Sequence, residues 1–486
     1  MKLMLDENKL RQAFPDTTVF KDPEIIAIFK AASIPAFLRD WILKRKSGQD
    51  GIVHDIEALR QYIYDIIPRR ESLLEIKDAA RMGCSNKFLA KIEIEFNVRN
   101  DKYTFAIPDL GLSHSETLIE DYVWDRIKRE VLKTSGGWGL VQLGYHSPDD
   151  EIKRGCFTLL EYKNFCPYKI DLDAYREART YFSISEWLDI LLGAIDYNPE
   201  GYESWPQKHL MLTRLLPFIE PRLNLVELAP KGPGKSYLFG RIGKYGWLVS
   251  GGTVTRAKLF GDISGKSAGL VASHDFVALD EIQSISFNDP SEMQGGLKAY
   301  MESGEITVGK NRIIGNSGII LLGNIPHEDM DETRDMFRVL PAIFHESALL
   351  DRFHGYIQGR DIPRMNEGLK IRGWALNTEY FSEIMHLLRE PAETLRYRRI
   401  AEALVSYPVD ADTRDTEAVL RLCTAYLKLL FPHVLSPSDI EITEFKRYCL
   451  RPAVKMRSTI RHQLQKIDPA EYGKKKFANY TGSESW

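Results

Sequence analysis

The sequence predicts an α/β P-loop core between an α+β N-terminal domain and a C-terminal helical lid. A glycine-rich turn at 229–236 joins an apolar strand to a helix start, and strands alternate with short helices from about 221 to 365, as in a parallel sheet. Helical periodicity returns from about 375 to 466. The expected domains are 1–175, 176–370 and 371–470, followed by a polar tail at 471–486.

The regions on either side of the core differ in their patterns. In the N-terminal domain, two-residue alternation at 88–96 and 103–107 around a polar turn predicts a β-hairpin. Its other expected elements are helices at 34–43, 55–67 and about 115–133, and strands at 138–145 and 157–162. These strands form either a small barrel or a sheet. In the lid, helices are expected at 380–389, 394–404, 416–431 and 442–467.

The glycine-rich turn has the composition of a phosphate-binding loop. Backbone amides around Gly232 and Gly234 would surround a β-phosphate, while Lys235 would reach the β- and γ-phosphates. The Ser236 hydroxyl would occupy one position on Mg²⁺. The residues predicted to surround the nucleotide are Ala229, Pro230, Lys231, Gly232, Pro233, Gly234, Lys235 and Ser236. Ala229 replaces the first glycine of the pattern and Pro233 lacks an N–H, so we expect weaker nucleotide binding than in a standard loop.

Polar residues that follow later strands complete a predicted ATPase site. Asp280 would hold Mg²⁺ through water, and Glu281 would polarise the attacking water. Asn324, at the end of the apolar run 318–324, is placed to sense the γ-phosphate. Arg352 would act as an arginine finger in the pocket of a neighbouring subunit. The expected catalytic residues are therefore Lys235, Glu281, Asn324 and Arg352, and the expected cofactors are ATP and Mg²⁺.

Two insertions bear on the substrate. Residues 250–269 are rich in glycine and contain Lys266, and residues 304–315 read as a hairpin with Lys310 at its tip and Arg312 just after. In a ring ATPase both would line the central channel, where cations can follow a phosphate backbone without reading sequence. Alternatively, these charges are solvated turn residues. A polypeptide substrate stays open, although the order at 259–261 is the reverse of a protein-threading pore loop.

Composition restricts the partners and the compartment. The 65 basic and 68 acidic residues give a net charge of −3, so any DNA contact must come from a local cluster. The five cysteines lack metal-ligand spacing and fit a reducing compartment. The N-terminus lacks a signal-peptide apolar region, and no uncharged apolar run is long enough to span a bilayer. We therefore expect a cytoplasmic protein without a membrane partner.

Over about residues 30–470 the sequence resembles the BrxL family of Lon-related proteins from bacterial phage-exclusion (BREX) systems. The phrases that carry this resemblance lie at 178–189, 228–236, 249–252, 276–281, 300–304, 323–324 and 350–354. The resemblance implies an α/β AAA+ P-loop ATPase core with a motor similar to that of MCM helicases. It also implies hexamers or double hexamers on double-stranded DNA, antiviral defence, and other defence-system proteins as partners.

The same resemblance implies roles for individual residues. The run 301–314 is similar to the MCM pre-sensor hairpin, with Lys310 at the position of its DNA-contacting lysine, and Arg457 would be a second sensor arginine at the nucleotide. The chain resembles shorter members without a C-terminal Lon-like protease domain, so we expect no proteolysis. Two alternatives to a DNA-associated motor stay open: a nucleotide-dependent DNA clamp that does not hydrolyse ATP, and a protein-remodelling ring.

Overall fold

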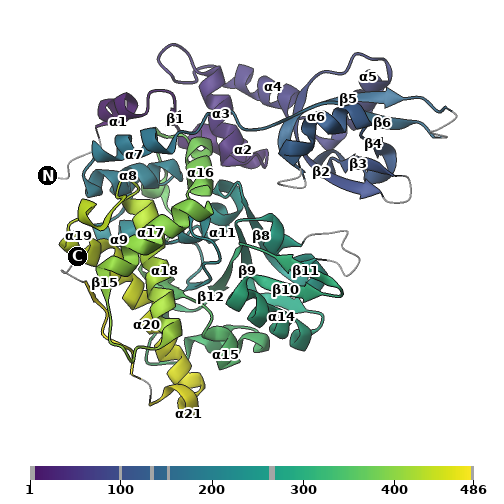
Figure 1. Cartoon of the computed structure of the whole chain (residues 1–486). Coiled ribbons are helices and arrows are strands. Elements are labelled where there is room, and N and C mark those ends of the chain that lie inside the picture. Colours follow the sequence, from purple (N-terminus) through teal and green to yellow (C-terminus); the bar gives the residue numbers. More distant parts are fainter. Residues whose placement is uncertain are drawn as a thin grey trace. The chain divides into compact units, whose positions relative to one another are not determined.

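The computed structural model describes residues 6–97, 101–131, 136–149, 154–261, 269–474 and 476–482 (Figure 1). Contacts divide the chain into a smaller unit, residues 45–169, and a larger unit that combines residues 1–44 with residues 170–486. The sequence pattern places residues 1–44 in the N-terminal domain, 1–175. Their contacts instead group them with the larger unit, because these residues pack against segments far away in the sequence.

A five-stranded parallel sheet forms the centre of the larger unit, as the sequence predicts. Its order is β13-β7-β12-β9-β8. The strands are β7 (Leu225–Ala229), β8 (Gly246–Val254), β9 (Phe276–Phe287), β12 (Gly318–Asn324) and β13 (Gly355–Gln358). β7 is buried along its whole length, as expected for a parallel strand covered on both faces. Asn324 pairs with Ala229, and Leu321 with Leu279, so the carboxyl ends of three strands meet at one edge.

Helices cover this sheet and continue beyond it. Before and within the sheet they are α7 (Leu172–Thr180), α8 (Ile184–Ala194), α9 (Trp205–Thr213), α10 (Leu216–Ile219), α11 (Lys235–Tyr237), α12 (Arg256–Phe260), α13 (Leu270–Ser273), α14 (Pro290–Ser303) and α15 (Ser347–Leu350). After it come α16 (Thr378–Leu387), α17 (Pro391–Leu404), α18 (Thr413–Leu430), α19 (Ile442–Phe445), α20 (Arg451–Ile467) and α21 (Pro469–Tyr472). The C-terminal helices agree with the sequence, except that a π-turn at 446–450 interrupts the helix expected at 442–467.

The N-terminal segment of the larger unit contributes α1 (Glu7–Ala13), β1 (Thr18–Lys21), α2 (Pro23–Ala31) and α3 (Ala36–Lys46). β1 pairs with β14 (Gly373–Leu376), more than 350 residues later in the chain. A buried ionic cluster adds to this pairing: Arg39 donates to both carboxylate oxygens of Asp196 at 2.7 Å, and the Tyr237 hydroxyl donates to the same carboxylate at 2.6 Å. Burial alone would raise the pKa of Asp196, but Arg39 and Lys21 lower it below its ordinary value. The cluster therefore fixes α3 against the first helical residues after the glycine-rich loop.

The smaller unit is a five-stranded barrel. Its helices are α4 (Ile56–Ile66), α5 (Leu73–Arg81) and α6 (Asp121–Val131), and its strands are β2 (Phe88–Asn97), β3 (Lys102–Ala106), β4 (Thr117–Leu118), β5 (Gly136–His146) and β6 (Cys156–Asn164). The order β3-β2-β5-β6-β4 has one parallel pair, β4 with β6, and the Ile119 N–H donates to the Tyr103 carbonyl at 2.8 Å to join its two edges. This is the topology of an OB barrel. The predicted hairpin is confirmed as β2–β3, and the barrel alternative is the one adopted.

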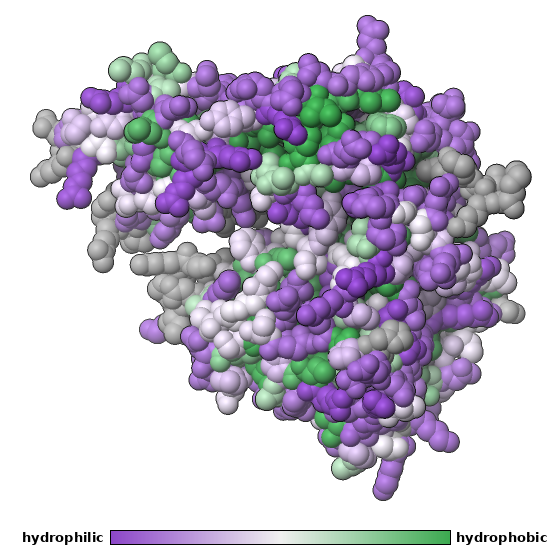
Figure 2. All heavy atoms as spheres, turned by 180° about the vertical axis from the view of Figure 1, so that it is seen from behind, coloured by the Kyte–Doolittle hydropathy of each residue, from purple (hydrophilic) through white to green (hydrophobic). Residues whose placement is uncertain are grey.

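Two short antiparallel pairs remain, β10 (Glu305–Val308) with β11 (Asn311–Ile314), and β15 (Val405–Ser406) with β16 (Thr481–Gly482). On the face shown in Figure 2, hydrophilic residues predominate and apolar residues gather in smaller patches. In the described part of the chain, none of the helices combines the length and the apolar character needed to cross a membrane.

Candidate functional site

A cavity of about 620 Å³ opens in the larger unit at the carboxyl edge of the parallel sheet. One wall is the glycine-rich loop, residues 231–237, together with Asn324 at the end of β12 and with Asp280 and Glu281, which lie inside β9 just past Leu279, its last residue paired with β12. Further lining residues come from α2 and from residues 365–371, where the Met365 N–H donates to the Gly232 carbonyl at 3.0 Å. The volume is that of a small-molecule site, and polar groups from several strands converge on it.

The glycine-rich loop adopts a conformation that depends on its glycines. Gly232 and Gly234 have φ values of 99° and 78°, in the left-handed region that glycine enters at little cost. Lys235 is buried, and its Nζ donates to the Gly323 carbonyl at 2.6 Å and to Asn324 Oδ1 at 3.0 Å. Burial lowers the pKa of Lys235, and a bound phosphate would favour the charged form. Of the predicted loop residues, 231–236 line the cavity, Pro230 is half-buried, and Ala229 is fully buried at the end of β7.

A buried ion pair contacts the backbone of this loop. Arg214 donates to the two carboxylate oxygens of Glu227 at 2.9 and 2.5 Å, and its third nitrogen donates to the Pro233 carbonyl at 2.7 Å. Both side chains are fully buried, so each charge depends on the other. Pro233 offers no amide to a phosphate, but its carbonyl is held by an arginine. Sequence reasoning missed this support, although a single glutamate inside the apolar run of β7 is a signal for a buried partner.

The acidic residues predicted for the metal and the water lie beside the loop. The Ser236 hydroxyl donates to Asp280 Oδ2, and Asp280 is only 4% exposed. Glu281 is exposed, and its φ of 50° is unusual for a residue with a side chain. Backbone strain of this kind is typical of functional positions. A hydroxyl at the start of α11 and a carboxylate of β9 in contact beside the glycine-rich loop fit Mg²⁺, which prefers oxygen ligands and retains several waters.

Helix α2 adds apolar residues to the lining of the cavity. Pro23, Ile26 and Ala27 line it from this helix, together with the apolar side chains of Met365 and Ile371. A flat heterocycle would exclude water from such a surface, whereas the triphosphate would lie at the glycine-rich loop. Helix α2 was not predicted as part of the site, because no local motif marks a helix that reaches the cavity from the start of the chain.

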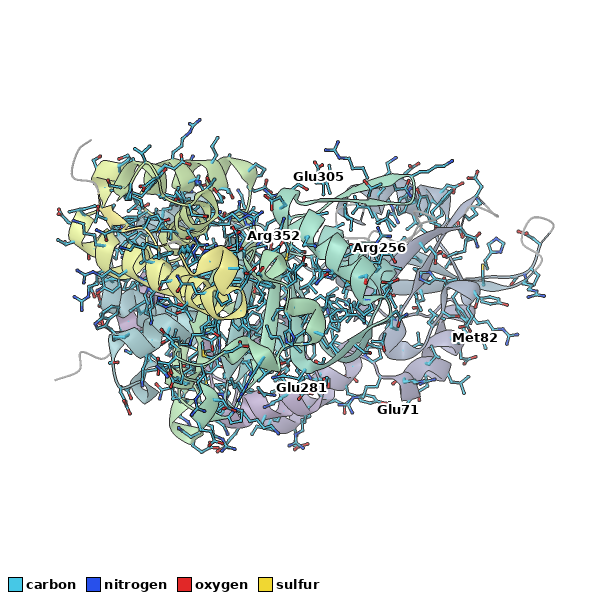
Figure 3. All side chains as sticks on the ribbon, turned by 90° about the horizontal axis from the view of Figure 1, so that it is seen from below. Glu71, Met82, Arg256, Glu281, Glu305 and Arg352 are labelled. Carbon is cyan, nitrogen blue, oxygen red and sulfur yellow. The ribbon has the colours of Figure 1, made fainter. Side chains whose placement is uncertain are left out.

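Arg352 lies outside this cavity. It follows α15, where one guanidinium nitrogen is 3.0 Å from Glu302 Oε2 and another donates to the Ala348 carbonyl. Figure 3 shows Arg352 and Glu281 at separate places. Arg352 therefore does not contact the pocket of its own subunit, and its action on a neighbouring subunit stays a prediction.

Arg457 does not have the position expected of a second sensor. It is fully buried, and its nitrogens donate to the carboxylates of Asp415 and Asp351 at 2.7 and 2.5 Å and to the Phe353 carbonyl at 2.7 Å. It is absent from the cavity lining. The prediction that Arg457 contacts the nucleotide is therefore corrected: its donors are used within the protein, and it fixes the loop that carries Arg352.

The predicted hairpin is present as β10 and β11, with Gly309 and Lys310 exposed at its tip. Arg312 is paired with Glu305 across the hairpin, Nε to Oε2 at 3.0 Å. Arg256 of α12 donates to the Thr307 carbonyl at 2.8 Å, so a residue outside the hairpin holds strand β10, which leads to the tip. Glu305 of β10 and Arg256 of α12 are labelled in Figure 3. Lys266, the remaining predicted DNA contact, lies outside the described residues.

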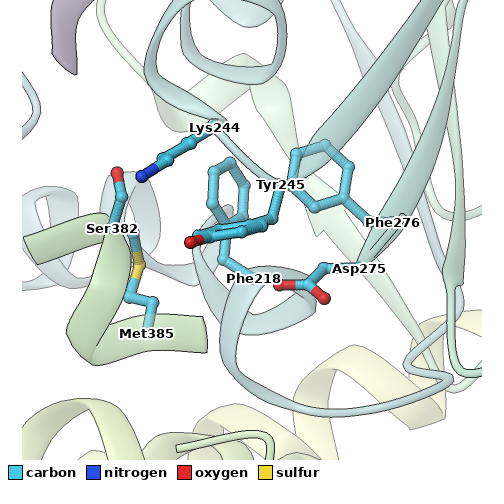
Figure 4. A pocket seen from close by; sticks show the side chains of 7 residues that line it. All are labelled: Phe218, Lys244, Tyr245, Asp275, Phe276, Ser382 and Met385. Carbon is cyan, nitrogen blue, oxygen red and sulfur yellow. The ribbon is translucent and has the colours of Figure 1, made fainter. Parts of the chain in front are cut away.

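A second, much smaller cavity lies between the sheet and α16 (Figure 4). Its volume of about 10 Å³ is near that of one water-sized sphere, so it has no room for a substrate. Lys244 at its wall contacts both Glu379 and Glu383 of α16. Burial raises the pKa of Glu379 to about 8. The positive charge of Lys244 lowers this pKa, and the negative charge of Glu383 raises it further. This cluster joins α16 to the sheet and is structural.

The Glu379 cluster predicts a specific pH dependence of stability. The folded protein retains a proton on Glu379 that the unfolded chain, with an ordinary pKa near 4.5, has lost. Its contribution to the free energy of unfolding should therefore fall between about pH 5 and pH 8, by at most about 1.4 kcal/mol per pH unit, and then level off. Glu379→Gln keeps a neutral side chain at every pH, so its Tm minus that of the wild type should rise across this window.

Thermal unfolding in steps from pH 5 to pH 9 measures this difference. Glu203→Gln, which changes an exposed glutamate far from α16 in sequence, provides the control and should give a constant difference. Parallel wild-type and Glu379→Gln curves would show that Glu379 is charged in the folded protein throughout this range.

Comparison with known proteins identifies the family of the chain. Residues 157–478 match the family described as Lon-like protease BrxL-like, ATPase domain, and residues 12–145 match BREX system Lon protease-like protein BrxL N-terminal. The chain is 28% identical over 475 residues to Lon-like protease BrxL of Escherichia coli O9:H4 (strain HS), which covers 95% of this chain and 65% of that protein. It is 29% identical over 491 residues to Lon-like protease BrxL of Bacillus cereus (strain H3081.97), covering 98% and 69%.

The chain thus spans about two thirds of the length of these relatives. Within that span, the matched ATPase domain contains the parallel sheet, the glycine-rich loop and the whole carboxyl-edge wall of the cavity. Sequence motif, fold and family comparison therefore point to one assignment. The chain belongs to the BrxL family of Lon-like BREX-system proteins and carries the ATPase domain of that family.

Proposed function

We propose that this chain hydrolyses ATP at interfaces between adjacent copies and uses the reaction to move on, or clamp, double-stranded DNA in BREX-type defence against phage. The observation that carries the proposal is the convergence of Lys235, Ser236 and Asp280, with Asn324 and Glu281, on one cavity at the end of a parallel sheet. Parallel α/β sheets bind ligands at this edge, and these are the residue types that phosphoryl transfer requires.

Each residue has a distinct task in the proposed reaction. Lys235 and the loop amides bind the β- and γ-phosphates, and Asn324, already in contact with Lys235, orients the γ-phosphate. Ser236 and Asp280 hold the metal, which would neutralise charge on the transferred phosphoryl group. Glu281 orients the attacking water and accepts its proton. Its exposed position at the cavity is compatible with contact to solvent water before the site closes.

The arrangement of Arg352 supports assembly into a ring. An arginine finger must reach the γ-phosphate, and Arg352 contacts Glu302 and the Ala348 carbonyl and does not line the cavity at the glycine-rich loop of its own chain. A neighbouring copy would bring its pocket to this face, which requires a head-to-tail interface. Such interfaces form a ring where the rotation between copies closes, and we propose a closed hexamer or double hexamer with other defence-system proteins as partners.

The hairpin is the proposed DNA contact. Lys310 is exposed at the tip of the two-stranded hairpin β10–β11, and within the described residues it has no ion-pair partner. Arg312, in contrast, is engaged by Glu305. Repeated around a ring, Lys310 would present one cation per subunit to the phosphate backbone of DNA. Contacts of this kind would bind DNA of any sequence.

Lys310→Ala should weaken DNA binding and reduce the slope of log affinity against log salt, because each lost phosphate contact lowers that slope by about 1. The measurement is a salt titration of duplex binding with ATP present. Lys298→Ala removes a lysine that is paired with Glu346 and should leave both quantities unchanged. An unchanged slope for Lys310→Ala would favour a protein-remodelling ring. Phosphate release in the same samples is expected to exceed background, whereas a passive clamp would release none.

A further inference from the structure

Two arginines from different elements converge on one carboxylate in the larger unit. Glu302, next to the last residue of α14, has its Oε2 atom 3.0 Å from a guanidinium nitrogen of Arg352 and 3.3 Å from one of Arg414. Arg352 follows α15 and Arg414 is the second residue of α18. The Glu302 and Arg414 side chains are 54% and 41% exposed, so this group lies at the protein surface.

Each of the two guanidinium groups also has a hydrogen-bond partner other than Glu302. Arg414 also donates to Asp351 Oδ2 at 3.0 Å, and the buried Arg457 fixes the other oxygen of Asp351 at 2.5 Å. Arg352 is held by the Ala348 carbonyl, and its Nε is buried without a hydrogen-bond partner. Removing Glu302 would therefore leave two positioned cations, the 41% exposed Arg414 and the 16% exposed Arg352, and Arg352 has an unsatisfied donor.

Two guanidinium groups around a single oxygen anion also form a suitable arrangement for a phosphate, since arginine pairs with carboxylate and phosphate in the same geometry. Glu302 has half-exposed ion pairs, and pairs of this kind hold their partners only a few-fold more strongly than solvent does. A nucleotide phosphate carries more charge than a carboxylate and would be held by a second protein surface. It would therefore compete successfully for the same two cations.

We propose that Glu302 is a displaceable internal anion: it occupies Arg352 and Arg414 in the separate subunit, and the terminal phosphate of the nucleotide in a neighbouring copy replaces it on assembly. The inference rests on the proposed function, because it needs that neighbouring phosphate. It assigns Arg414 to the second cationic position for which the sequence had suggested Arg457. In the isolated subunit, Glu302 would also compensate the positive charge of Arg352.

The test replaces Glu302 with glutamine, which keeps the shape and removes the charge. Glu292→Gln is the matched control, since Glu292 lies on the same helix, is also 54% exposed, and has one arginine partner, Arg256, at 3.0 Å. Assembly is followed by sedimentation at increasing protein concentration with ATP and Mg²⁺, and phosphate release is measured in parallel. We expect half-assembly of Glu302→Gln at a two- to fivefold lower protein concentration than the wild type, with Glu292→Gln unchanged.

A second substitution separates Arg414 from its partner. Arg414→Gln in the Glu302→Gln background should lower the rate of phosphate release per assembled subunit at least tenfold, because it removes a cation from the neighbouring phosphate. An unchanged rate would mean that Arg414 only pairs with Glu302 and would overturn its assignment. Equal assembly curves for Glu302→Gln and the wild type would overturn the competition.

Failure of the proposed function looks different. A wild type that assembles with ATP but releases no phosphate would refute the ATPase, whereas the sedimentation shift would still decide the role of Glu302. A wild type that stays monomeric at every ATP concentration would overturn both. Glu302→Gln should unfold at the wild-type temperature, because the carboxylate it replaces is exposed.

Discussion

Glu281→Gln is expected to abolish ATP hydrolysis while the protein still binds nucleotide. Glu281 is exposed at the cavity and follows Asp280, so glutamine keeps the size of the side chain but loses the proton acceptor. General-base catalysis contributes about 10²–10⁴-fold to such reactions. The groups that hold the phosphates, Lys235 and the loop amides, are untouched. Phosphate release should therefore fall to background, and titration with a fluorescent ATP analogue should give an affinity close to that of the wild type.

Glu203→Gln again serves as the control, since this exposed glutamate does not line the cavity, and it should hydrolyse ATP at the wild-type rate. Hydrolysis by Glu281→Gln at that rate would refute the proposed mechanism. Loss of nucleotide binding in Glu281→Gln would show instead that the left-handed backbone at this position, with its φ of 50°, is needed to form the pocket.

Arg352→Ala should lower the rate of hydrolysis about 10³-fold or more and leave nucleotide binding by each subunit intact. Arg352 does not line the cavity of its own chain, so its loss removes stabilisation only from a pocket completed by a neighbour. Arg334→Ala is the matched control: Arg334 is an exposed arginine that pairs with Asp329, and its loss should have no effect on hydrolysis.

Mixing the two inactive variants tests this action between subunits directly. In a mixed ring, the intact Glu281 of an Arg352→Ala subunit can face the intact Arg352 of a Glu281→Gln subunit, so hydrolysis should return at those interfaces. The mixture is assayed for phosphate release over a range of ratios, with a maximum expected near equal amounts. A mixture as inactive as its components would mean that Arg352 supports the structure of its own subunit.

The neighbourhood of residues 229–236, 280–281 and 324 could be predicted because each follows or ends a buried apolar run in the sequence, although β9 itself continues past the two acids to Phe287. Carboxyl ends of parallel strands meet at one edge, so a strand pattern already implies that these residues are close, and the register of Asn324 with Ala229 agrees. The hairpin at 305–314 was equally local, since alternation and a glycine-containing turn specify it. Arg457 shows the limit, because an arginine in a helical pattern gives no indication of whether its partner is a phosphate or a buried aspartate.

The sequence by itself determined the parallel core, the position of the glycine-rich loop and the acids next to it, because these depend on short-range patterns and on strand direction. Only the tertiary structure decided that residues 1–44 complete the cavity, that Arg214 and Glu227 support the loop, and that Glu302 lies between two arginines. These contacts join side chains far apart in the chain. Their formation depends on how whole elements pack, which no local periodicity specifies.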